Sequence, residues 1–489
     1  MTGQDACFTG LPIELIEHIF AHLWDPLDLV NASSTCKQLR AASERPVKEH
    51  LMLASRYSNL NFDDEDPSIN VWTTLDEMLK DPRIPYHVCK IDFGLDRPRF
   101  YDASVRGSWE ISPTTIRPPR DLLDRLLNAD GMEAILRDGT EVPPLWNTSR
   151  NPFLDLEDGI DDPINSAILR QLPNLHEISL VDSGEDVNLG RFLVDTIIGP
   201  QQCTNPPFLS KLKDVKLEHW DTEGGMRLNF VLYFMHFPSV RTIRGHMIHA
   251  NGESALATSD SILLKSNITT LILTYSNVDL SALEDLLNRT KGLKSFSYAH
   301  AGANVGDADY DPRGIIACLL KHAGRSLEVL KFEDEDDESV EEGFPYCSLS
   351  GFDTLKIVDI RWSTLSPDAG DIVNESEEDE PLSQGFFSQN NAYHFELDVA
   401  SALPATIQRL KLTKFPDEGV SSIVKLLEDD KLHGALPNLS HISLCRFEGE
   451  PASDWNKLYK AAKTADIVVD QKADSTEAGI RLLQSEWNT

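Results

Sequence analysis

The sequence predicts an α/β protein: a small three-helix module at the amino end, followed by an irregular array of strand and helix units whose strands form a curved parallel sheet. Three observations predict this fold. Apolar residues recur with helical spacing between residues 11 and 43. A short apolar phrase typical of buried strands returns from about residue 86 onward, and helical patterns separate several of its copies. Because a strand one helix away from the next must run parallel to it, we expect the helices on the convex side of the sheet.

Three short helices account for the amino-terminal stretch. Pro12 can open the first, where its missing N–H costs nothing, and the apolar residues of that helix share one face: Leu15, Ile16, Ile19, Phe20 and Leu23. Asp25 is a typical N-cap and Pro26 a typical first helical residue, so a second helix begins there. Ser34 or Thr35 can cap a third. Helices this short cannot bury their own apolar faces, which indicates that they pack against a partner.

The same stretch resembles the F-box, the helical module through which adaptor subunits bind the Skp linker protein of cullin-RING ubiquitin ligases. The matching residues are Leu11, Pro12, Glu14, Ile19, Phe20, Leu23, Asp28, Leu29 and Cys36. The chain departs from the pattern at Thr35 and Leu39, where the family often has valine and tryptophan. The resemblance implies that the Skp protein is bound by Leu11, Pro12, Leu15, Ile16, Ile19, Leu23, Leu27, Leu29 and Leu39. The alternative is an amphipathic helical cap that belongs to the domain following it.

A repeated phrase organises the rest of the chain: an apolar residue, two arbitrary residues, an apolar residue, one arbitrary residue and a third apolar residue. Leu175, Ile178 and Leu180 form one copy. Other copies begin at Val88, Leu212, Ile268, Leu293, Leu327, Leu355, Ile407 and Leu439. A further copy begins at Val240 but has Gly245 at its last apolar position. From Leu175 onward the copies start 25 to 52 residues apart, which indicates a repeat array with insertions.

Helical patterns lie between copies, at residues 228–237, 280–287, 315–322 and 420–427, and at 455–465 before a strand at 467–469 that would cap the array. Strand and helix alternate in this way in leucine-rich-repeat proteins. An F-box followed by such repeats resembles the F-box and leucine-rich-repeat adaptor family, although the copies here lack that family's regular asparagine or cysteine turn position. A non-repetitive α/β domain is the alternative.

The sequence divides into five zones. Residues 1–10 form a short tail, and residues 11–60 hold the F-box and a linker helix. Residues 71–165 hold a first repeat and a proline-rich insertion, a composition that predicts loop. Residues 166–470 form the main leucine-rich-repeat array, and residues 471–489 a C-terminal cap or tail.

The chain has 45 Lys and Arg against 79 Asp and Glu, a net charge of -34, so most of its surface repels DNA and RNA. Acidic runs at residues 333–342 and 375–380 are typical of solvated loops. There is no signal peptide and no apolar window of membrane-spanning length, so we expect a soluble cytoplasmic or nuclear protein without membrane contact. Seven scattered cysteines without a Cys-x-x-Cys pair predict buried free thiols rather than disulfides or a zinc site.

The sequence contains no set of residues typical of an enzyme active site. It has no phosphate-binding glycine loop, nucleophile elbow, His-Glu-x-x-His or dinucleotide fingerprint. His246 and His249 lack a third ligand nearby, and neither acidic run has the spacing of a calcium loop. We therefore expect no enzyme activity, no catalytic residue, no metal and no cofactor.

The pattern supports binding surfaces better than catalysis. Residues that flank the second apolar position of each phrase, or follow the third, should point to the concave face, because strand neighbours alternate faces. The basic residues placed there are Lys216, Arg244, Lys331, Arg361, Arg409 and Lys411. We expect this face to read an acidic or phosphorylated segment of a target protein. The expected function is a substrate-recognition adaptor, and the alternative is a non-degradative Skp-bound scaffold or an acidic repeat protein that sequesters a partner.

Overall fold

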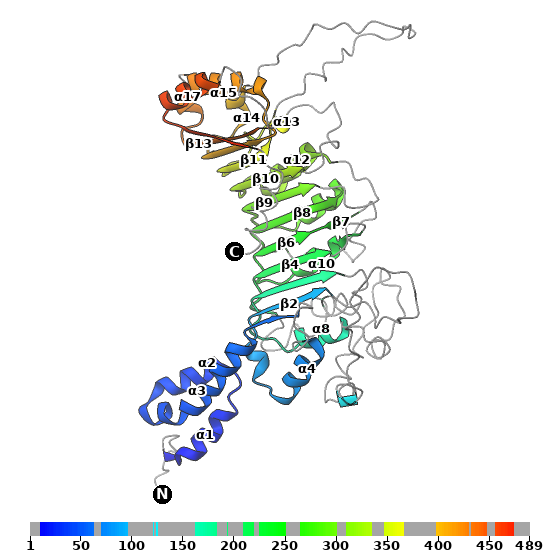
Figure 1. The fold of residues 1–489 in the computed structure, drawn as a ribbon, viewed down its shortest axis with the longest axis vertical. Helices are drawn as coiled ribbons and strands as arrows, with labels where there is room; N and C mark the ends of the chain where they lie inside the picture. Colours follow the sequence, from blue (N-terminus) through cyan, green and yellow to red (C-terminus); the bar gives the residue numbers. More distant parts are fainter. Residues whose placement is uncertain are drawn as a thin grey trace. The chain divides into compact units, whose positions relative to one another are not determined.

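The computed structural model describes residues 10–62, 70–95, 121, 124–125, 162–182, 193, 209–219, 224–250, 265–300, 310–334, 347–365, 398–429, 432–446 and 455–473. The chain forms two compact units (Figure 1). Unit 1 comprises Met1–His246 and Ala255–Asn267, and unit 2 comprises Met247–Ser254 and Ile268–Thr489. The proline-rich insertion, most of the two acidic runs, residues 1–9 and residues 474–489 lie outside the described residues, whereas residues 471–473 of the predicted C-terminal cap or tail belong to the last strand.

Unit 1 begins with the three predicted helices, α1 (Ile13–Ala21), α2 (Pro26–Thr35) and α3 (Lys37–Tyr57). Pro12 is the N-cap of α1 rather than its first helical residue. The Asp25 carboxylate accepts the Leu27 N–H at 2.8 Å, as expected for the cap of α2.

The prediction of Ser34 or Thr35 as the cap of the third helix was wrong. Both residues belong to α2, where their hydroxyls donate to the carbonyls of Asn31 and Ala32. The N-cap of α3 is Cys36, whose Sγ accepts the Leu39 N–H at 3.5 Å. A hydroxyl that donates to a carbonyl one turn back competes with capping, and this decides the boundary.

A separate linker helix after the F-box region was also predicted, and the structure instead has one continuous helix. α3 is 21 residues long and carries Pro46 in its interior. Proline inside a helix removes one backbone donor and is unfavourable there unless packing compensates for it. The buried Pro46 ring and the helix after it pack within unit 1, so tertiary contacts hold α3 together across this position.

The strands of unit 1 are β1 (Asn59–Asn61), β2 (Lys90–Leu95), β3 (Glu177–Asp182), β4 (Asp214–His219), β5 (Met226–Arg227) and β6 (Thr242–His246). β1, β2, β3, β4 and β6 pair in that order, all parallel. Its further helices are α4 (Val71–Lys80), the single 3-10 turn η2 (Ile84–Tyr86), α8 (Asp162–Leu169) and α10 (Leu228–Met235). The sequence did not predict β1, a three-residue strand that adds a copy before the first apolar phrase.

In unit 2 the strands are β7 (Ile248–Ala250), β8 (Thr270–Val278), β9 (Ser295–His300), β10 (Val329–Asp334), β11 (Ile357–Arg361), β12 (Arg409–Thr413), β13 (His441–Arg446) and β14 (Val468–Ala473). β8 to β14 pair in chain order and run parallel, and β7 pairs with β8. The helices are α11 (Leu280–Asn288), α12 (Pro312–Ala323), α13 (Trp362–Leu365), α14 (Val399–Ala402), η5 (Asp417–Gly419), α15 (Val420–Glu428), α16 (Leu432–Ala435) and α17 (Trp455–Thr464).

The apolar phrase is the core of both units. In β4 and β12 its residues alternate with more exposed ones and are fully buried, with Val215, Leu217, Leu410 and Leu412 at 0% exposure, whereas β9 and β11 are buried at every position after the first. The predicted parallel α/β arrangement is therefore confirmed. The assignment to leucine-rich repeats and the curvature of the array stay predictions. Among the described helices, none is long and apolar enough to cross a membrane.

A polar residue directly before the apolar phrase forms a hydrogen bond to the preceding copy. In three copies this residue is Asn174, Asn267 or Asn438, whose side-chain amide donates to a backbone carbonyl two residues before the preceding phrase, on Tyr86, Pro238 and Ala405. In three others it is a hydroxyl residue that donates to the first apolar residue of the preceding phrase: Ser326 to Leu293, Thr354 to Leu327 and Thr406 to Leu355. In these six copies the residue directly before the phrase thus bonds to the preceding copy, at a place other than the family's turn position.

Replacing Asn174 with alanine should destabilise unit 1 by about 1–2 kcal/mol, because the Tyr86 carbonyl loses its 2.7 Å donor and the Lys211 ammonium loses its 2.6 Å acceptor. The free energy of unfolding in urea measures the effect. The matched control is Asn438→Ala, which removes an exposed 3.2 Å bond of the same kind and should cost less. Equal losses in the two variants would contradict the burial argument.

Candidate functional site

The three amino-terminal helices enclose a small core of their own. Ile16, Phe20, Leu29, Leu39 and Ala42 are its buried members. Leu11 and Leu23 pack against this core and are partly buried. Of the nine residues predicted to contact Skp, Ile16, Leu29 and Leu39 therefore face the interior of the module. These three residues hold the helices together, and contact with a partner stays a prediction for the exposed residues.

Several apolar side chains of α1 and α2 are exposed. Leu15, Ile19 and Leu27, all predicted to contact Skp, are 50%, 37% and 57% exposed. Three further exposed apolar residues lie on the same two helices or between them, and the prediction did not include them: Ile13, Trp24 and Val30. Exposed apolar side chains that gather on a small module are typical of a contact surface, which makes these six the candidates for one. We call Ile13, Leu15, Ile19, Trp24, Leu27 and Val30 together the outer apolar face.

An arginine from beyond the helices fixes α3 to the rest of unit 1. Arg83, next to η2, donates to Asp81 through Nε at 2.9 Å and Nη2 at 2.8 Å, and to Glu49 of α3 at 2.8 Å. These bonds from the guanidinium hold the pKa of both carboxyls below the ordinary range. Asp81 and Glu49 thus carry full negative charge beside Arg83 at neutral pH.

A buried histidine pair joins the same elements. The Leu23 carbonyl can only accept, so His50 Nε2 donates to it at 3.1 Å. His50 Nδ1 must then accept from His87 Nε2, 2.8 Å away. Burial, with the nearby Arg83 charge, lowers the pKa of both imidazoles, that of His87 to about 4. Two neutral rings therefore connect the end of α1, α3 and η2 in one hydrogen-bonded chain.

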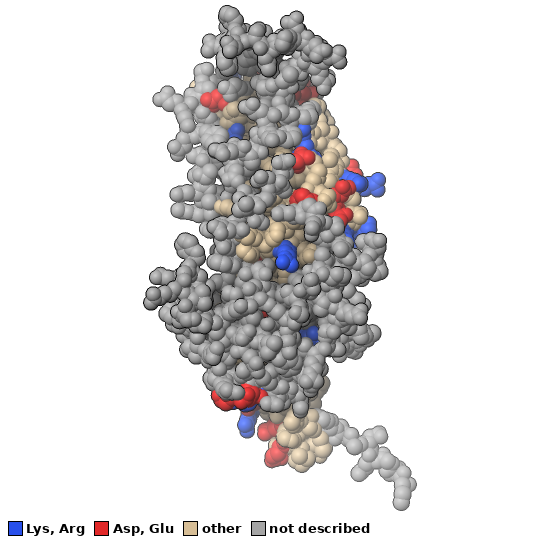
Figure 2. Space-filling model, turned by 90° about the vertical axis from the view of Figure 1, so that its right-hand side faces the viewer, with Lys and Arg blue, Asp and Glu red and all other residues tan. Residues whose placement is uncertain are grey.

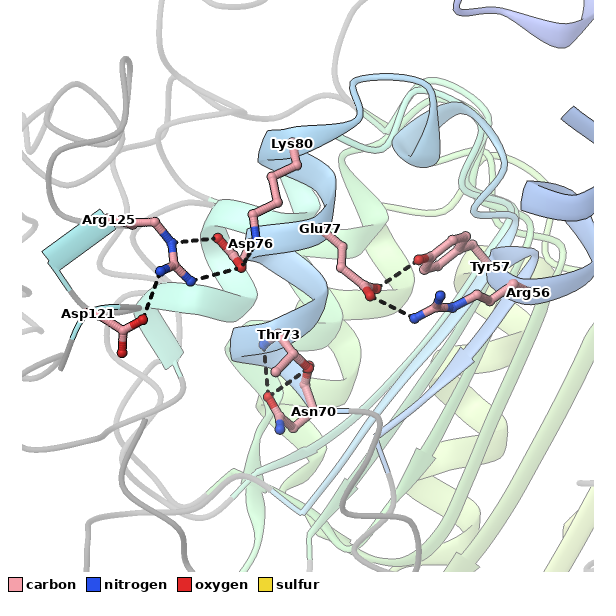
Figure 3. A network of polar contacts seen from close by, with 9 residues as sticks. All are labelled: Arg56, Tyr57, Asn70, Thr73, Asp76, Glu77, Lys80, Asp121 and Arg125. Carbon is pink, nitrogen blue, oxygen red and sulfur yellow. Dashed lines mark hydrogen bonds and ion pairs between the residues drawn. The ribbon is translucent and has the colours of Figure 1, made fainter. Parts of the chain in front are cut away.

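A second polar network binds α3 to α4 (Figure 3). Glu77 accepts from the Tyr57 hydroxyl and from Arg56, both at 2.7 Å. Burial and the Glu77 carboxylate raise the pKa of Tyr57 to about 12. Asp76, directly before Glu77 on α4, pairs with Lys80 and Arg125. The two bonds to Glu77 hold the end of α3 against α4.

Comparison with known proteins adds one finding. Residues 8–48 match the F-box-like family model. The chain carries an F-box-like domain. The match covers α1, α2 and the first half of α3, which are the elements that form the small core and the outer apolar face. No curated protein matches the chain. The F-box-like domain is thus the part of the predicted family resemblance that is confirmed.

The basic residues predicted to bind substrate are divided between the units. Lys216 and Arg244 are register partners on β4 and β6 of unit 1. Lys216 forms an ion pair with Glu218 at 2.8 Å, and Arg244 lies 4.0 Å from Asp214. The other four are on β10, β11 and β12 of unit 2: Lys331, Arg361, Arg409 and Lys411.

Within unit 2 most of these four side chains interact with the protein itself. Lys411 pairs with Asp359 at 2.8 Å, and Lys331, Asp359 and Lys411 occupy one register row across three strands. Arg361 is only 6% exposed. Arg409, at the start of β12, is exposed. A common substrate face formed by all six residues stays a prediction.

In the described part of the chain, no group of three or more His, Cys, Asp or Glu side chains is placed to hold a metal ion. Cys36, Cys89, Cys318, Cys347 and Cys445 are free thiols. Only Cys318 and Cys445 are buried, so the predicted burial holds for two of these five. The expected absence of catalysis and of cofactors stays a prediction.

Proposed function

We propose that this protein is a substrate adaptor that binds the Skp linker protein through its F-box-like domain and a target protein through its repeat units, for ubiquitination by a cullin-RING ligase. The observation that carries the proposal is the outer apolar face, which lies on the helices of the matched domain. Burying apolar surface contributes roughly 25 cal/mol per Å² removed from water, so a partner that covers this face gains affinity from it. No catalytic group is needed in this role, because other subunits transfer ubiquitin.

The way the domain is attached supports an adaptor role. α3 runs without a break from the F-box-like domain to β1, and β1 pairs with β2. Arg83, the histidine pair and Glu77 fix α3 along its length. A partner that holds the domain therefore also orients the first strands of unit 1. A target bound there would be presented at a defined position.

The test is affinity purification of the full-length chain from cells, with quantification of Skp and cullin subunits and of target ubiquitination. Stoichiometric Skp and cullin, together with a protein whose ubiquitination falls when the chain is depleted, is the expected result. Skp without any change in ubiquitination would favour the non-degradative scaffold. Recovery of the chain without Skp or cullin would refute the adaptor role. Deleting residues 1–60 is a poor test, because it removes most of β1 and exposes the edge of β2.

A further inference from the structure

Most of the acidic excess of this protein lies outside the described residues. The described residues hold 35 Lys and Arg against 33 Asp and Glu, so 46 of the 79 acids but only 10 of the 45 bases lie in the remaining segments. On the face that Figure 2 presents, basic and acidic side chains of the described residues are interspersed. Because the described residues are together nearly neutral, their surface can contain both positively and negatively charged regions.

One such surface is the edge of the unit 2 sheet where the strands begin. Because β8 to β14 are parallel, their amino-terminal ends share one edge. Backbone bonds place Lys294, Glu328, Lys356 and Gln408 side by side there, each N–H donating to the carbonyl of the previous one in turn, at 2.7 to 2.9 Å. Residues just before or at the starts of β9 to β12 add Arg289, Lys291, Arg325 and Arg409.

This edge is strongly basic. We define the basic strip by its six cations: Arg289, Lys291, Lys294, Arg325, Lys356 and Arg409. At the starts of β9 to β12, Glu328 and Asp353 are the acidic residues among those described, and Asp466 precedes β14 farther along the same edge. Glu328 lies between Lys294 and Lys356, at 3.1 and 2.7 Å, and both lysines lower its pKa. Arg325 and Arg409 are exposed and have no ion-pair partner among the described residues.

The opposite edge of the same unit carries charges of both signs. Asp279, Asp311 and Asp417 follow the carboxyl ends of β8, β9 and β12, and Asp334 is the last residue of β10. Arg313 and Lys414 lie in the same segments, and Arg361 is the last residue of β11. Acidic side chains are thus more frequent there than at the starts of β9 to β12, so an anionic partner is attracted more strongly to the strand starts.

We propose that the basic strip is a docking surface for an acidic peptide segment of a partner protein. The proposal rests on the adaptor function in one respect, that the repeat units recruit a protein. Neighbouring strands lie about 4.8 Å apart, so β9 to β12 span about 14 Å, the length of about four to five extended residues. An extended segment with several Asp or Glu side chains fits this length, and the guanidinium groups of Arg325 and Arg409 suit carboxylates.

The chemistry of the strip favours a peptide over a nucleic acid. Binding of single-stranded DNA or RNA relies on aromatic side chains that stack with the bases. The exposed aromatic residues in the described part of the chain are Trp24 and Tyr459, and neither belongs to the strip. The acidic remainder of the chain would also repel a long polyanion more than a short peptide.

The test uses the purified full-length chain, whose capture of Skp is measured in parallel, and a fluorescent peptide of about twelve residues that alternates glutamate and serine. A glutamine and serine peptide serves for comparison. Fluorescence anisotropy is measured at about 50 mM and about 300 mM salt. The variant Arg325→Glu, Arg409→Glu should weaken binding of the acidic peptide at least about tenfold. The matched control, Lys460→Glu, Lys463→Glu, makes the same charge change on exposed residues of α17 and should weaken it less than about threefold.

A milder variant, Arg325→Gln, Arg409→Gln, guards against misfolding and should lose about threefold. Equal losses in the strip and control variants, equal binding of the glutamine peptide, or tighter binding of an RNA oligonucleotide of the same charge would each overturn the proposal. Retained Skp capture without peptide binding would refute the strip alone. Failure of the wild-type chain to capture Skp, with peptide binding intact, would refute the adaptor function alone.

Discussion

Replacing Ile19 with glutamate should reduce Skp capture by at least about 100-fold. Ile19 is 37% exposed on α1, within the outer apolar face beside the more exposed Leu15. A carboxylate there would remain in water in the free chain but would be buried without a partner in the complex, which costs several kcal/mol. Pull-down of purified Skp at graded concentrations measures the loss, and circular dichroism checks that the variant is folded.

A matched control separates this effect from a general response to a new charge. Leu280, at the start of α11 in unit 2, has the same 37% exposure, and Leu280→Glu should leave Skp capture unchanged. Ile16→Ala makes a different comparison, because Ile16 is fully buried in the core of the F-box-like domain. It should lower stability by about 2–5 kcal/mol and affect Skp through folding. Wild-type capture by Ile19→Glu would remove the outer apolar face from the proposed interface.

Lowering the pH from 7 to about 4.5 should weaken the packing of α3 against η2 by roughly 2–3 kcal/mol. The pKa of His87 is lowered to about 4 in the folded protein, mainly by burial, and that of His50 is lowered as well. Below about pH 6.5 the two histidines bind protons in the unfolded chain but stay neutral in the folded protein. Their contribution to the free energy of unfolding is therefore complete above about pH 6.5 and is lost as the pH falls toward about 4. Hydrogen exchange of backbone amides in α3 reports the local unfolding free energy.

The variant His87→Gln isolates this contribution. Its amide can still donate to His50 Nδ1 but cannot titrate, so the pH dependence of α3 opening should shrink by more than half. Asp81 and Glu49 also lose stabilisation in acid, since their pKa values are lowered by Arg83. That loss occurs below their ordinary pKa values, mostly at lower pH than the histidine effect. An unchanged pH dependence in His87→Gln would contradict a role for the pair.

Most strands and helices of the two units were predictable, because the apolar pattern within each copy is enough to indicate its strand and its helix. The phrase beginning at Leu439 became β13 and the helical pattern at 420–427 became α15. Two-residue and three-residue strands such as β5 and β1 carry too few residues for any pattern. The partners of Asn174 and Lys411 depend on which copies become neighbours. That pairing is a property of the stacked array, so no single copy reveals it.

For the F-box-like domain, the sequence identified the helices but not which apolar residues face outward. Leu15 and Ile16 are adjacent in sequence, yet one is half exposed and the other fully buried. The rotation of about 100° per residue separates their directions, and packing of α1 against α3 decides which direction is inside. Leu29 and Val30 on α2 divide in the same way. The hydrogen bond between His50 and His87 could not be predicted from the sequence, because 37 residues separate the two histidines along the chain.

The polar tie before each phrase also bears on how such a chain can change length over evolutionary time. The hydrogen bond to the preceding copy fixes where a new strand starts, whatever the number of residues between the two copies. The residues that donate it include Asn438, Thr406 and Ser326. The copy at Ile407 starts 52 residues after the one at Leu355, yet β11 and β12 pair in register. The length of the sequence between two copies can therefore change without disturbing strand alignment.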